Sequence, residues 1–576
     1  MSLESNVKQK ADLIWAIADK LTGVYKPHEY GEVILPLTVI RRFDCILADT
    51  KAAVLERYAQ CKTLAMPEAL LRRASGHAFY NVSRFDFGKL LDDPDNIEAN
   101  FRAYLYGFSA NVRDIIEKFR FETHITTMSE KGILYAVLRE FTTPRADLHP
   151  DRISNLEMGY IFEEIIRRFS ESHNADAGQH YTPREVIELM VNILFHDDHE
   201  ALGGKNILRS LYDPACGTGG MLSVAEEYLH RLNPTCALLA FGQELNDQTY
   251  AICKADMLIK GNDASNIHDG NTLSNDQFRG QTFDYILSNP PFGREWKNEK
   301  NAVEQEARTG DAGRFGAGLP AIGDSQMLFL LTALSKMKTP ENGGSRIAII
   351  HNGSPLFTGD AGSGPSEIRK HIMENDLLEA IIALPNDIFY NTGIATYIWV
   401  LSNKKAGTKR AGKIQLIDAS DLFEKRRKAL GNKRNDIPQS AIDTITRLYG
   451  DMAENDISKI FDNSDFGYTK ITVERPLKDE QGNPVMKKGK IQPDPTLRDT
   501  ETIPLKEDVQ TYFEREVLPF VPDAWIDHAR TKTGYEIPFT RHFYRYEPPR
   551  PSDTMLSEII AIEKELDTAI RELFHE

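Results

Sequence analysis

Apolar residues recur along the chain with two different periods, and the period changes near a proline-containing break at residues 142–150. Before this break they recur every three or four positions, as at Leu105, Phe108 and Val112. This is the spacing of amphipathic helices. Prolines and a change of pattern mark boundaries. We therefore expect an all-helical N-terminal domain over residues 1–148.

Beyond the break, short apolar runs that are typical of buried strands alternate with helical segments. The strand-like runs cover residues 207–212, 238–242, 283–288, 346–351, 378–384, 397–401 and 414–417. Alternation of this kind favours an α/β fold, in which helices cover both faces of a largely parallel sheet. We expect a catalytic domain at 149–464, an extended or hairpin region at 465–550 and a helical extension at 551–576.

The third apolar run leads directly into Asn289-Pro290-Pro291-Phe292. An exocyclic amine on a nucleobase has its lone pair delocalised into the ring, so it needs two acceptors aimed at its hydrogens before it attacks a methyl group. The Asn289 oxygen and the carbonyl of Pro290 can supply them, and two prolines hold such a loop rigid. Phe292 would stack on a base taken out of its helix. An ordinary turn after a strand is the other interpretation.

A glycine-rich segment follows the first apolar run, as Asp213-Pro214-Ala215-Cys216-Gly217-Thr218-Gly219-Gly220. Glycines after a strand let the backbone approach a ligand closely. They do not form the G-x-G-x-x-G pattern of dinucleotide sites. Glu244 ends the second run, where a carboxylate can accept ribose hydroxyls. Asp269 ends a third strand, although an Asp-Gly turn explains it equally well.

A further candidate segment, Ala177-Gly178-Gln179-His180-Tyr181-Thr182-Pro183-Arg184, directly precedes a helical pattern. Thr182 and Pro183 suit the start of a helix, which alone would explain them. Tyr181 and the free backbone groups at a helix start also suit a carboxylate or a methionine moiety.

Together these segments resemble the modification subunit of type I restriction-modification systems, an S-adenosylmethionine-dependent adenine-N6 DNA methyltransferase. The resemblance extends over nearly the whole chain, from residues 35–42 through 384–396 to 536–541 and 546–551. It implies a Rossmann-like methyltransferase sheet. His180 departs from the family pattern, where an aromatic residue such as Tyr or Phe is more common.

The resemblance also implies the residues of the site. The catalytic loop falls on Asn289, Pro290, Pro291 and Phe292, and Asp269 is expected to meet the adenine of the cofactor. The S-adenosylmethionine site falls on Gly178, Gln179, His180, Tyr181, Thr182, Pro183, Asp213, Gly217, Thr218, Gly219, Gly220, Glu244 and Asp269.

The net charge of −16 changes the picture for a DNA enzyme, because Lys and Arg supply most of the affinity for phosphates. We expect this chain to hold double-stranded DNA weakly by itself. The resemblance implies a separate specificity subunit, a second modification subunit and a restriction subunit as partners. Residues 404–434 form a basic island, in which we assign DNA contact to Lys425, Arg426, Arg427, Lys428, Lys433 and Arg434. A solvated surface is the alternative.

The cysteines and the hydropathy of the chain indicate the cellular compartment. The five cysteines show no C-x-x-C pair, which favours a reduced cytoplasm and no metal site. No apolar run is long enough to cross a bilayer, and no secretory leader is visible at the start. We therefore expect a cytoplasmic protein without membrane contact.

Two segments are expected to act outside the sheet. A stretch with Gly310, Gly313, Gly316, Gly318 and Gly323 is too rich in glycine to pack tightly, so we expect a mobile segment that orders with DNA and cofactor, or else a plain flexible loop. A helix at 553–574 carries a coiled-coil-like apolar seam. We expect it to pair with the specificity subunit, although docking on its own core is the usual case. The seam consists of Ile559, Ile562, Leu566, Ile570 and Leu573.

The predicted reaction is direct methyl transfer to a flipped adenine. Cytosine-N4 transfer is harder to exclude, although Asn rather than Ser before the first proline favours adenine. A glutamine-N5 protein methyltransferase is an alternative, because the amide nitrogen of glutamine is as hard to methylate as the amine of a base and these enzymes use a similar loop. Their chains are usually much shorter. A catalytically silent scaffold or cofactor-sensing subunit is a third hypothesis. A tritium-transfer assay on DNA separates the three.

Overall fold

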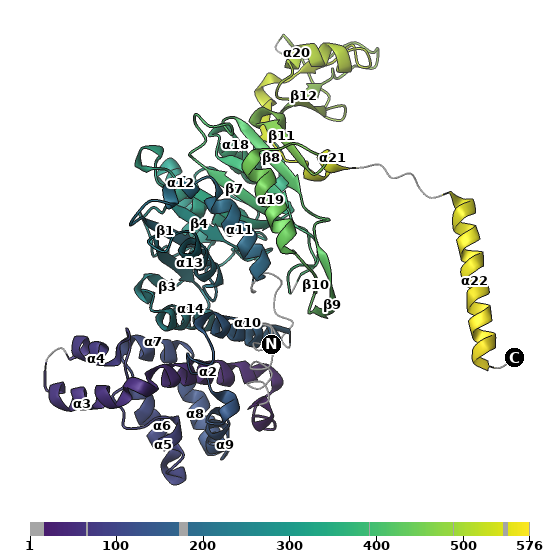
Figure 1. Ribbon diagram of the computed structural model, residues 1–576. Coiled ribbons are helices and arrows are strands. Elements are labelled where there is room, and N and C mark those ends of the chain that lie inside the picture. The colour runs from purple at the N-terminus through teal and green to yellow at the C-terminus, as the bar shows by residue number, and fades with distance from the viewer. Residues whose placement is uncertain are drawn as a thin grey trace. The chain divides into compact units, whose positions relative to one another are not determined.

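The computed structural model describes residues 17–64, 67–171, 182–390, 392–487, 489–544 and 551–574. Its chain forms two compact units, Met1–Ile537 and Pro538–Glu576. The first unit holds the helical N-terminal region, the large sheet and a smaller sheet. The second holds the C-terminal helices (Figure 1).

The N-terminal region is helical throughout its described part, as its apolar spacing predicts. α2 is buried on nearly all sides and carries Pro36 within it. It packs against α8, α9 and α10. The helices are α2 (Tyr30–Leu47), α3 (Lys51–Cys61), α4 (Glu68–Ser75), α5 (Phe87–Leu90), α6 (Ile97–Tyr106), α7 (Ala110–Lys118), α8 (Phe121–Glu130), α9 (Leu134–Phe141) and α10 (Asn155–Glu171).

A nine-stranded sheet forms the centre of the first unit, in the order β11-β8-β6-β7-β5-β4-β1-β2-β3. β7 runs antiparallel to β5 and β6, and β11 runs antiparallel to β8. All seven strand-like runs of the sequence are strands of this sheet, so that prediction is confirmed. The strands are β1 (Leu208–Asp213), β2 (Ala237–Glu244), β3 (Ile267–Asp269), β4 (Tyr285–Ser288), β5 (Arg346–Asn352), β6 (Leu378–Ala383), β7 (Thr396–Ser402), β8 (Lys413–Asp418) and β11 (Ser458–Asp462).

The strand order reverses between β1 and β4. β1 pairs with β2 on one side and with β4 on the other, all in parallel. Crevices for ligands open at the carboxyl ends of the strands at such a switch point. The glycine loop follows β1 and the Asn289 loop follows β4, so the topology alone brings the two sequence signatures together.

Helices cover both faces of the sheet, as the alternation predicts (Figure 1). Because right-handed crossovers leave the switch point in opposite directions, the helix after β1 and the helix after β4 lie on opposite faces. α13 (Gly220–Leu232), α11 (Arg184–His196) and α19 (Gln439–Asp451) form a contiguous row on one face. α16 (Gln326–Ser335) and α18 (Gly364–Glu374) pack together on the other.

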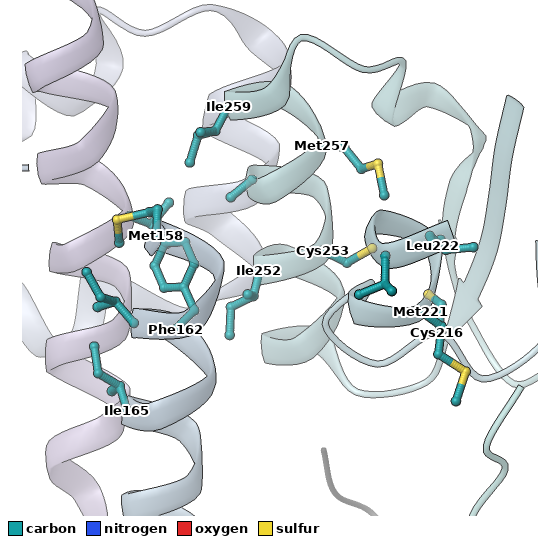
Figure 2. Packing of buried hydrophobic residues seen from close by; sticks show 14 of the residues in the cluster. Met158, Phe162, Ile165, Cys216, Met221, Leu222, Ile252, Cys253, Met257 and Ile259 are labelled. Carbon is teal, nitrogen blue, oxygen red and sulfur yellow. The ribbon is translucent and has the colours of Figure 1, made fainter. Parts of the chain in front are cut away.

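The helical region and the sheet share one apolar core. Figure 2 shows Met158, Phe162 and Ile165 of α10 on one side of α14 (Asp247–Lys260), with Cys216, Met221 and Leu222 on the other. All six side chains are buried. The core therefore runs from the N-terminal helices to the segment that follows β1.

The glycine-rich stretch after the catalytic loop is closely packed, so the expectation of a loose segment is wrong. A Cβ on Gly316 would come within 2.3 Å of the Gly310 carbonyl oxygen, and a Cβ on Gly364 within 1.8 Å of the Leu319 carbonyl oxygen. Phe315 in this stretch is fully buried. Glycine allows two backbone segments to approach each other closely, and it also makes a segment flexible. A glycine-rich sequence alone does not tell these two uses apart.

A smaller antiparallel sheet follows the large one, in the region where the sequence predicts a hairpin or an extended segment. β12 (Gly467–Glu474) pairs with β15 (Asp499–Pro504), with β16 (Trp525–Ile526) and with β17 (Lys532–Tyr535). The excursion between β12 and β15 carries the two-stranded β13 (Met486–Lys487) and β14 (Lys490–Ile491).

The second unit contains α21 (Phe539–Phe543) and α22 (Ser552–Phe574). α22 confirms the predicted terminal helix. The seam residues Ile559, Ile562, Leu566 and Ile570 are exposed, and the side chain of Leu573 lies outside the described residues. Residues 546–550 of the family-like C-terminal segment also lie outside them.

Candidate active site

A cavity of about 540 Å³ lies at the carboxyl ends of β1, β2 and β4. Four of the predicted cofactor residues in the β1 segment line it, together with Glu244 at the end of β2. Asn289 and Pro291 of the predicted catalytic loop line the same space. The predicted residues of the β1 segment that line it are Asp213, Gly217, Thr218 and Gly220.

The β1 segment requires glycine at two positions. Gly217 and Gly219 have φ of 53° and 82°, in the left-handed region that side chains disfavour. A Cβ on Gly219 would also come within 2.7 Å of Cys253 Sγ in α14. The turn therefore needs glycine at both positions in order to lie close against α14 and to lead into α13 at Gly220.

Glu244 is held by the backbone at the cavity wall. One carboxylate oxygen accepts the N–H of Gly217 at 2.8 Å, and the other accepts the N–H of Asn246 at 2.8 Å. Burial raises the pKa of this carboxyl. Each oxygen has a second lone pair, so the group can also accept hydroxyl donors from a ligand.

Asp213 links the β1 segment to the strand before the catalytic loop. Its Oδ1 accepts the Ala215 N–H at 3.0 Å and the Ser288 hydroxyl at 2.7 Å. The side chain is 2% exposed, and this burial raises its pKa to about 7. The group thus fixes the two halves of the site relative to each other.

Asn289 has one end fixed and the other free. Its Nδ2 donates to the Thr182 hydroxyl at 2.9 Å. Its Oδ1 is buried and has no hydrogen-bond partner. Because Thr182 uses the nitrogen, the oxygen is the end of the amide that can accept a hydrogen from a bound amine.

The segment before α11 serves the catalytic loop instead of a helix cap. Pro183 occupies the N-cap position of α11, and no side chain caps this helix end. The Thr182 hydroxyl bonds Asn289, so the capping role expected for Thr182 is wrong. Gly178, Gln179, His180 and Tyr181 lie outside the described residues.

Phe292 and Pro290 are buried and are not among the described residues that line the cavity. The Phe292 ring packs edge-on against Phe389, with centroids 6.2 Å apart and planes at 85°. The expected stacking of Phe292 on a base therefore stays a prediction, since the side chain is only 7% exposed in the structure.

Asp269 pairs with the helical region, and its predicted contact with the adenine of the cofactor stays a prediction. It lies in register with Glu244 at the edge of the sheet, but the described lining of the cavity does not include it. Lys118 of α7 donates to its Oδ2 at 2.5 Å, and this bond holds the pKa of Asp269 below its usual range. The Asp269 carboxylate therefore forms an ion pair with a lysine of the helical region. The residues just after β3 that line the cavity are Asn271, Thr272 and Leu273.

The N-terminal region supplies one wall of the cavity, which the sequence did not reveal. His28, Gly31, Glu32 and Leu35 line it. The Nε2 of His124 lies 3.4 Å from a Glu32 carboxylate oxygen. These residues carry no chemical motif, and a helix with ordinary polar positions gives no signal in a single sequence.

The basic island contains a hairpin of β9 (Glu424–Leu430) and β10 (Lys433–Asp436). Lys433 is 1% exposed and bonds Glu185 and two backbone carbonyls, so its assignment to DNA is wrong. Arg426 pairs with Asp436. The remaining assigned cations are exposed, namely Lys425, Arg427, Lys428 and Arg434.

No helix in the part of the chain that the structure describes has both the length and the apolar character needed to span a membrane.

Comparisons with known proteins agree with this geometry. A family model described as N-6 DNA Methylase matches residues 154–472, which is more than half of the chain. A second model, described as the HsdM N-terminal domain, matches residues 10–141.

Two curated relatives are similar over large parts of the chain. It is 25% identical over 456 residues to the type I restriction enzyme MjaIX methylase subunit of Methanocaldococcus jannaschii, which covers 75% of each protein. It is 29% identical over 287 residues to the type I restriction enzyme HindI methylase subunit of Haemophilus influenzae, which covers 49% of this chain and 58% of that protein.

A solved structure shares the fold. The type I restriction-modification system methyltransferase subunit from Streptococcus thermophilus aligns with a TM-score of 0.63 at 22% identity, over 80% of this chain and 97% of that one. With its switch-point cavity, its Asn-Pro-Pro-Phe loop and the matching family model, the chain belongs to the N-6 DNA methylase family, whose members transfer a methyl group from S-adenosylmethionine to adenine in DNA.

Proposed function

We propose that Asn289 and the Pro290 carbonyl grip the N6 amine of a flipped adenine at the mouth of the switch-point cavity. The observation that carries this proposal is the unpartnered, buried Oδ1 of Asn289. Buried polar atoms are paired in nearly all cases. An oxygen left over in the wall of a ligand cavity therefore indicates a hydrogen-bond donor that arrives with the substrate.

The residues present fit S-adenosylmethionine. Glycine-only turns at Gly217 and Gly219 leave room for close approach, and Glu244 offers acceptor sites for ribose hydroxyls. When bound, S-adenosylmethionine supplies the methyl group, its C–S bond breaking as the amine nitrogen bonds the methyl carbon and loses a proton to solvent.

The chain itself contributes position and polarity. Thr182 fixes the amide of Asn289 so that its oxygen accepts one amine hydrogen, and the Pro290 carbonyl accepts the other. Hydrogen bonds to these two acceptors fix the orientation of the amine. They also shift electron density back onto its nitrogen, so that the lone pair is more available to attack the methyl group. Preorganised groups of this kind account for much of an enzyme's rate enhancement.

The test is methyl transfer to DNA by the full chain with its specificity partner. Asn289→Ala should lower kcat by roughly 10²–10³-fold, which is typical for loss of a preorganised polar group. Thr182→Val keeps the shape but frees the amide, so its loss should be smaller, about 10-fold. Phe292→Ala should also lose activity if the ring stacks on the base. Cofactor affinity, measured by calorimetry, should persist in all three, and full activity of Asn289→Ala would contradict the assigned role.

We also propose that the chain acts as the modification subunit of a cytoplasmic type I complex, with a specificity subunit, a second modification subunit and a restriction subunit. The exposed apolar seam of α22 supports pairing with helices of the specificity subunit. Deleting residues 553–576 should abolish co-purification of that subunit while cofactor binding persists. Retained assembly in a pull-down would count against it.

A further inference from the structure

Two of the described side chains that line the cavity carry a buried polar atom without any partner. One is Asn289, through Oδ1, and the other is Ser325, through Oγ. Ser325 is 1% exposed. The proposed function uses the first oxygen and leaves the second unexplained.

Ser325 stands at a helix start without capping it. It occupies the N-cap position of α16, but its hydroxyl bonds no backbone N–H of the helix. Asp324 takes that role instead, since its Oδ1 accepts the Gln326 N–H at 3.1 Å. A serine at an N-cap normally caps with its own oxygen. The Ser325 hydroxyl does not cap α16 and is therefore available for another hydrogen bond.

The backbone of Ser325 is tied to the extension of the catalytic loop. Its N–H donates to the Arg294 carbonyl at 3.0 Å. Arg294 comes two residues after Phe292 and lines the cavity itself. Ser325 is therefore fixed in place next to the loop that carries Asn289.

One helical turn further along α16, Phe329 also lines the cavity. Residues four apart on a helix share one face, so Ser325 and Phe329 lie next to each other in the cavity wall. A hydroxyl that can donate next to an aromatic ring suits the edge and the face of a heterocyclic base.

We propose that Ser325 binds the target base by donating its hydroxyl hydrogen to the ring nitrogen beside the amine, N1 or N7, while Phe329 contacts the face of the base. This inference rests on the proposed function, which assigns only acceptors to the substrate edge. An adenine presents its amine between two acceptor nitrogens, so an edge-reading site needs a donor as well. The Ser325 hydroxyl supplies that donor.

A substrate-analogue cycle in the full chain with its specificity subunit tests the proposal. The target adenine of a duplex is replaced by 1-deazaadenine or by 7-deazaadenine, each of which removes one ring acceptor. The wild-type kcat/KM should fall about 5–10-fold on one analogue, as for loss of one neutral hydrogen bond. Ser325→Ala should show the same loss on adenine and no further loss on that analogue. Which analogue responds identifies the nitrogen.

Ser363→Ala is the matched control. Ser363 is also an N-cap serine with an unpartnered Oγ, at the start of α18, but it is not among the described residues that line the cavity. This variant should keep the full analogue penalty of the wild type.

The proposal is overturned if the wild type tolerates both analogues, if the penalties of analogue and Ser325→Ala multiply, or if Ser325→Ala weakens only cofactor binding. Failure of the proposed function is a separate result. In that case the wild type does not methylate adenine DNA at all, or Asn289→Ala remains fully active.

Discussion

The two ends of the large sheet differ in whether a buried charge has an opposite charge beside it. At the amino ends of β5 and β6, Arg346 lies 2.6 Å from Glu379 and 3.1 Å from Asp197. Arg410 lies 3.1 Å from the same Asp197 oxygen. Each of these charges has an opposite charge beside it, although Arg346 Nε and Arg410 Nη1 have no hydrogen-bond partner. At the carboxyl ends, Asn289 and Ser325 keep oxygens without a partner, and Asp213 has no cation beside it.

This difference separates two uses of buried polarity. A paired buried charge ties elements together, because removing one partner leaves the other charge uncompensated. An unpaired buried atom weakens the fold unless something else satisfies it. The unpaired oxygens at the carboxyl end therefore lower the stability of the free protein modestly, and a bound ligand can remove this penalty. The paired charges at the amino end hold the elements of the sheet together. Each prediction below changes one side of this comparison.

The largest effect is expected at the amino end, from Arg346→Met. This change leaves Glu379 buried without the Arg346 cation, removes one of the two arginines beside the exposed Asp197, and takes a donor from the Tyr449 hydroxyl. The free energy of unfolding should fall by about 3–5 kcal/mol, while the folded fraction keeps its affinity for cofactor. Urea unfolding and calorimetry measure the two quantities. The double variant Arg346→Met with Glu379→Met should recover much of the loss, and a double variant no more stable than the single would refute the pairing argument.

The sequence predicted the parts of the molecule whose cause is local. Each of the seven apolar runs became a strand, and the glycine and Asn-Pro-Pro-Phe segments follow β1 and β4 as their patterns required. Periodicity and turn chemistry act within a few residues, so they can be read directly. The fold class and the placement of both signatures at one cavity follow from this local information.

The parts that failed depend on distant partners. No feature of the sequence indicates that Asp269 pairs with Lys118, because Lys118 lies 151 positions away in the chain. Lys433 was assigned to DNA, but Glu185 lies 248 positions away and buries it. Gly313 and Gly316 were interpreted as sites of flexibility, although both lie against neighbouring backbone atoms. Ser325 gave no signal, because a serine before a helix normally indicates a cap.

A second prediction concerns Asp213, which lies between the two cases because it has hydrogen bonds but no cation. Its pKa is raised to about 7 by burial, so the folded state binds the proton more tightly than the unfolded state. The contribution to stability is full below the unfolded pKa of about 3.9 and is lost as pH rises through the folded value. Asp213→Asn stays neutral and keeps an oxygen for Ala215 and Ser288.

Between pH 5 and pH 8, the wild type should therefore lose about 2–3 kcal/mol of stability relative to Asp213→Asn. Unfolding by urea at four pH values measures this difference. A constant difference across that range would mean that the carboxyl is already ionised in the folded protein at pH 5.

The smallest effect is expected at the surface, where the basic hairpin repeats the comparison. Arg426 is paired with Asp436, whereas Arg427 is exposed without an ion-pair partner among the described residues. If unpaired cations serve ligands, Arg427→Gln should weaken DNA binding by the assembled complex by about 1 kcal/mol and lower the salt slope of log Kd by about one. Arg426→Gln is the neighbouring control, and its slope should stay unchanged because its charge is already neutralised by Asp436. A titration of DNA affinity against salt distinguishes them, since a reversed order of the two variants would show that pairing in the free protein does not predict which cations meet phosphate.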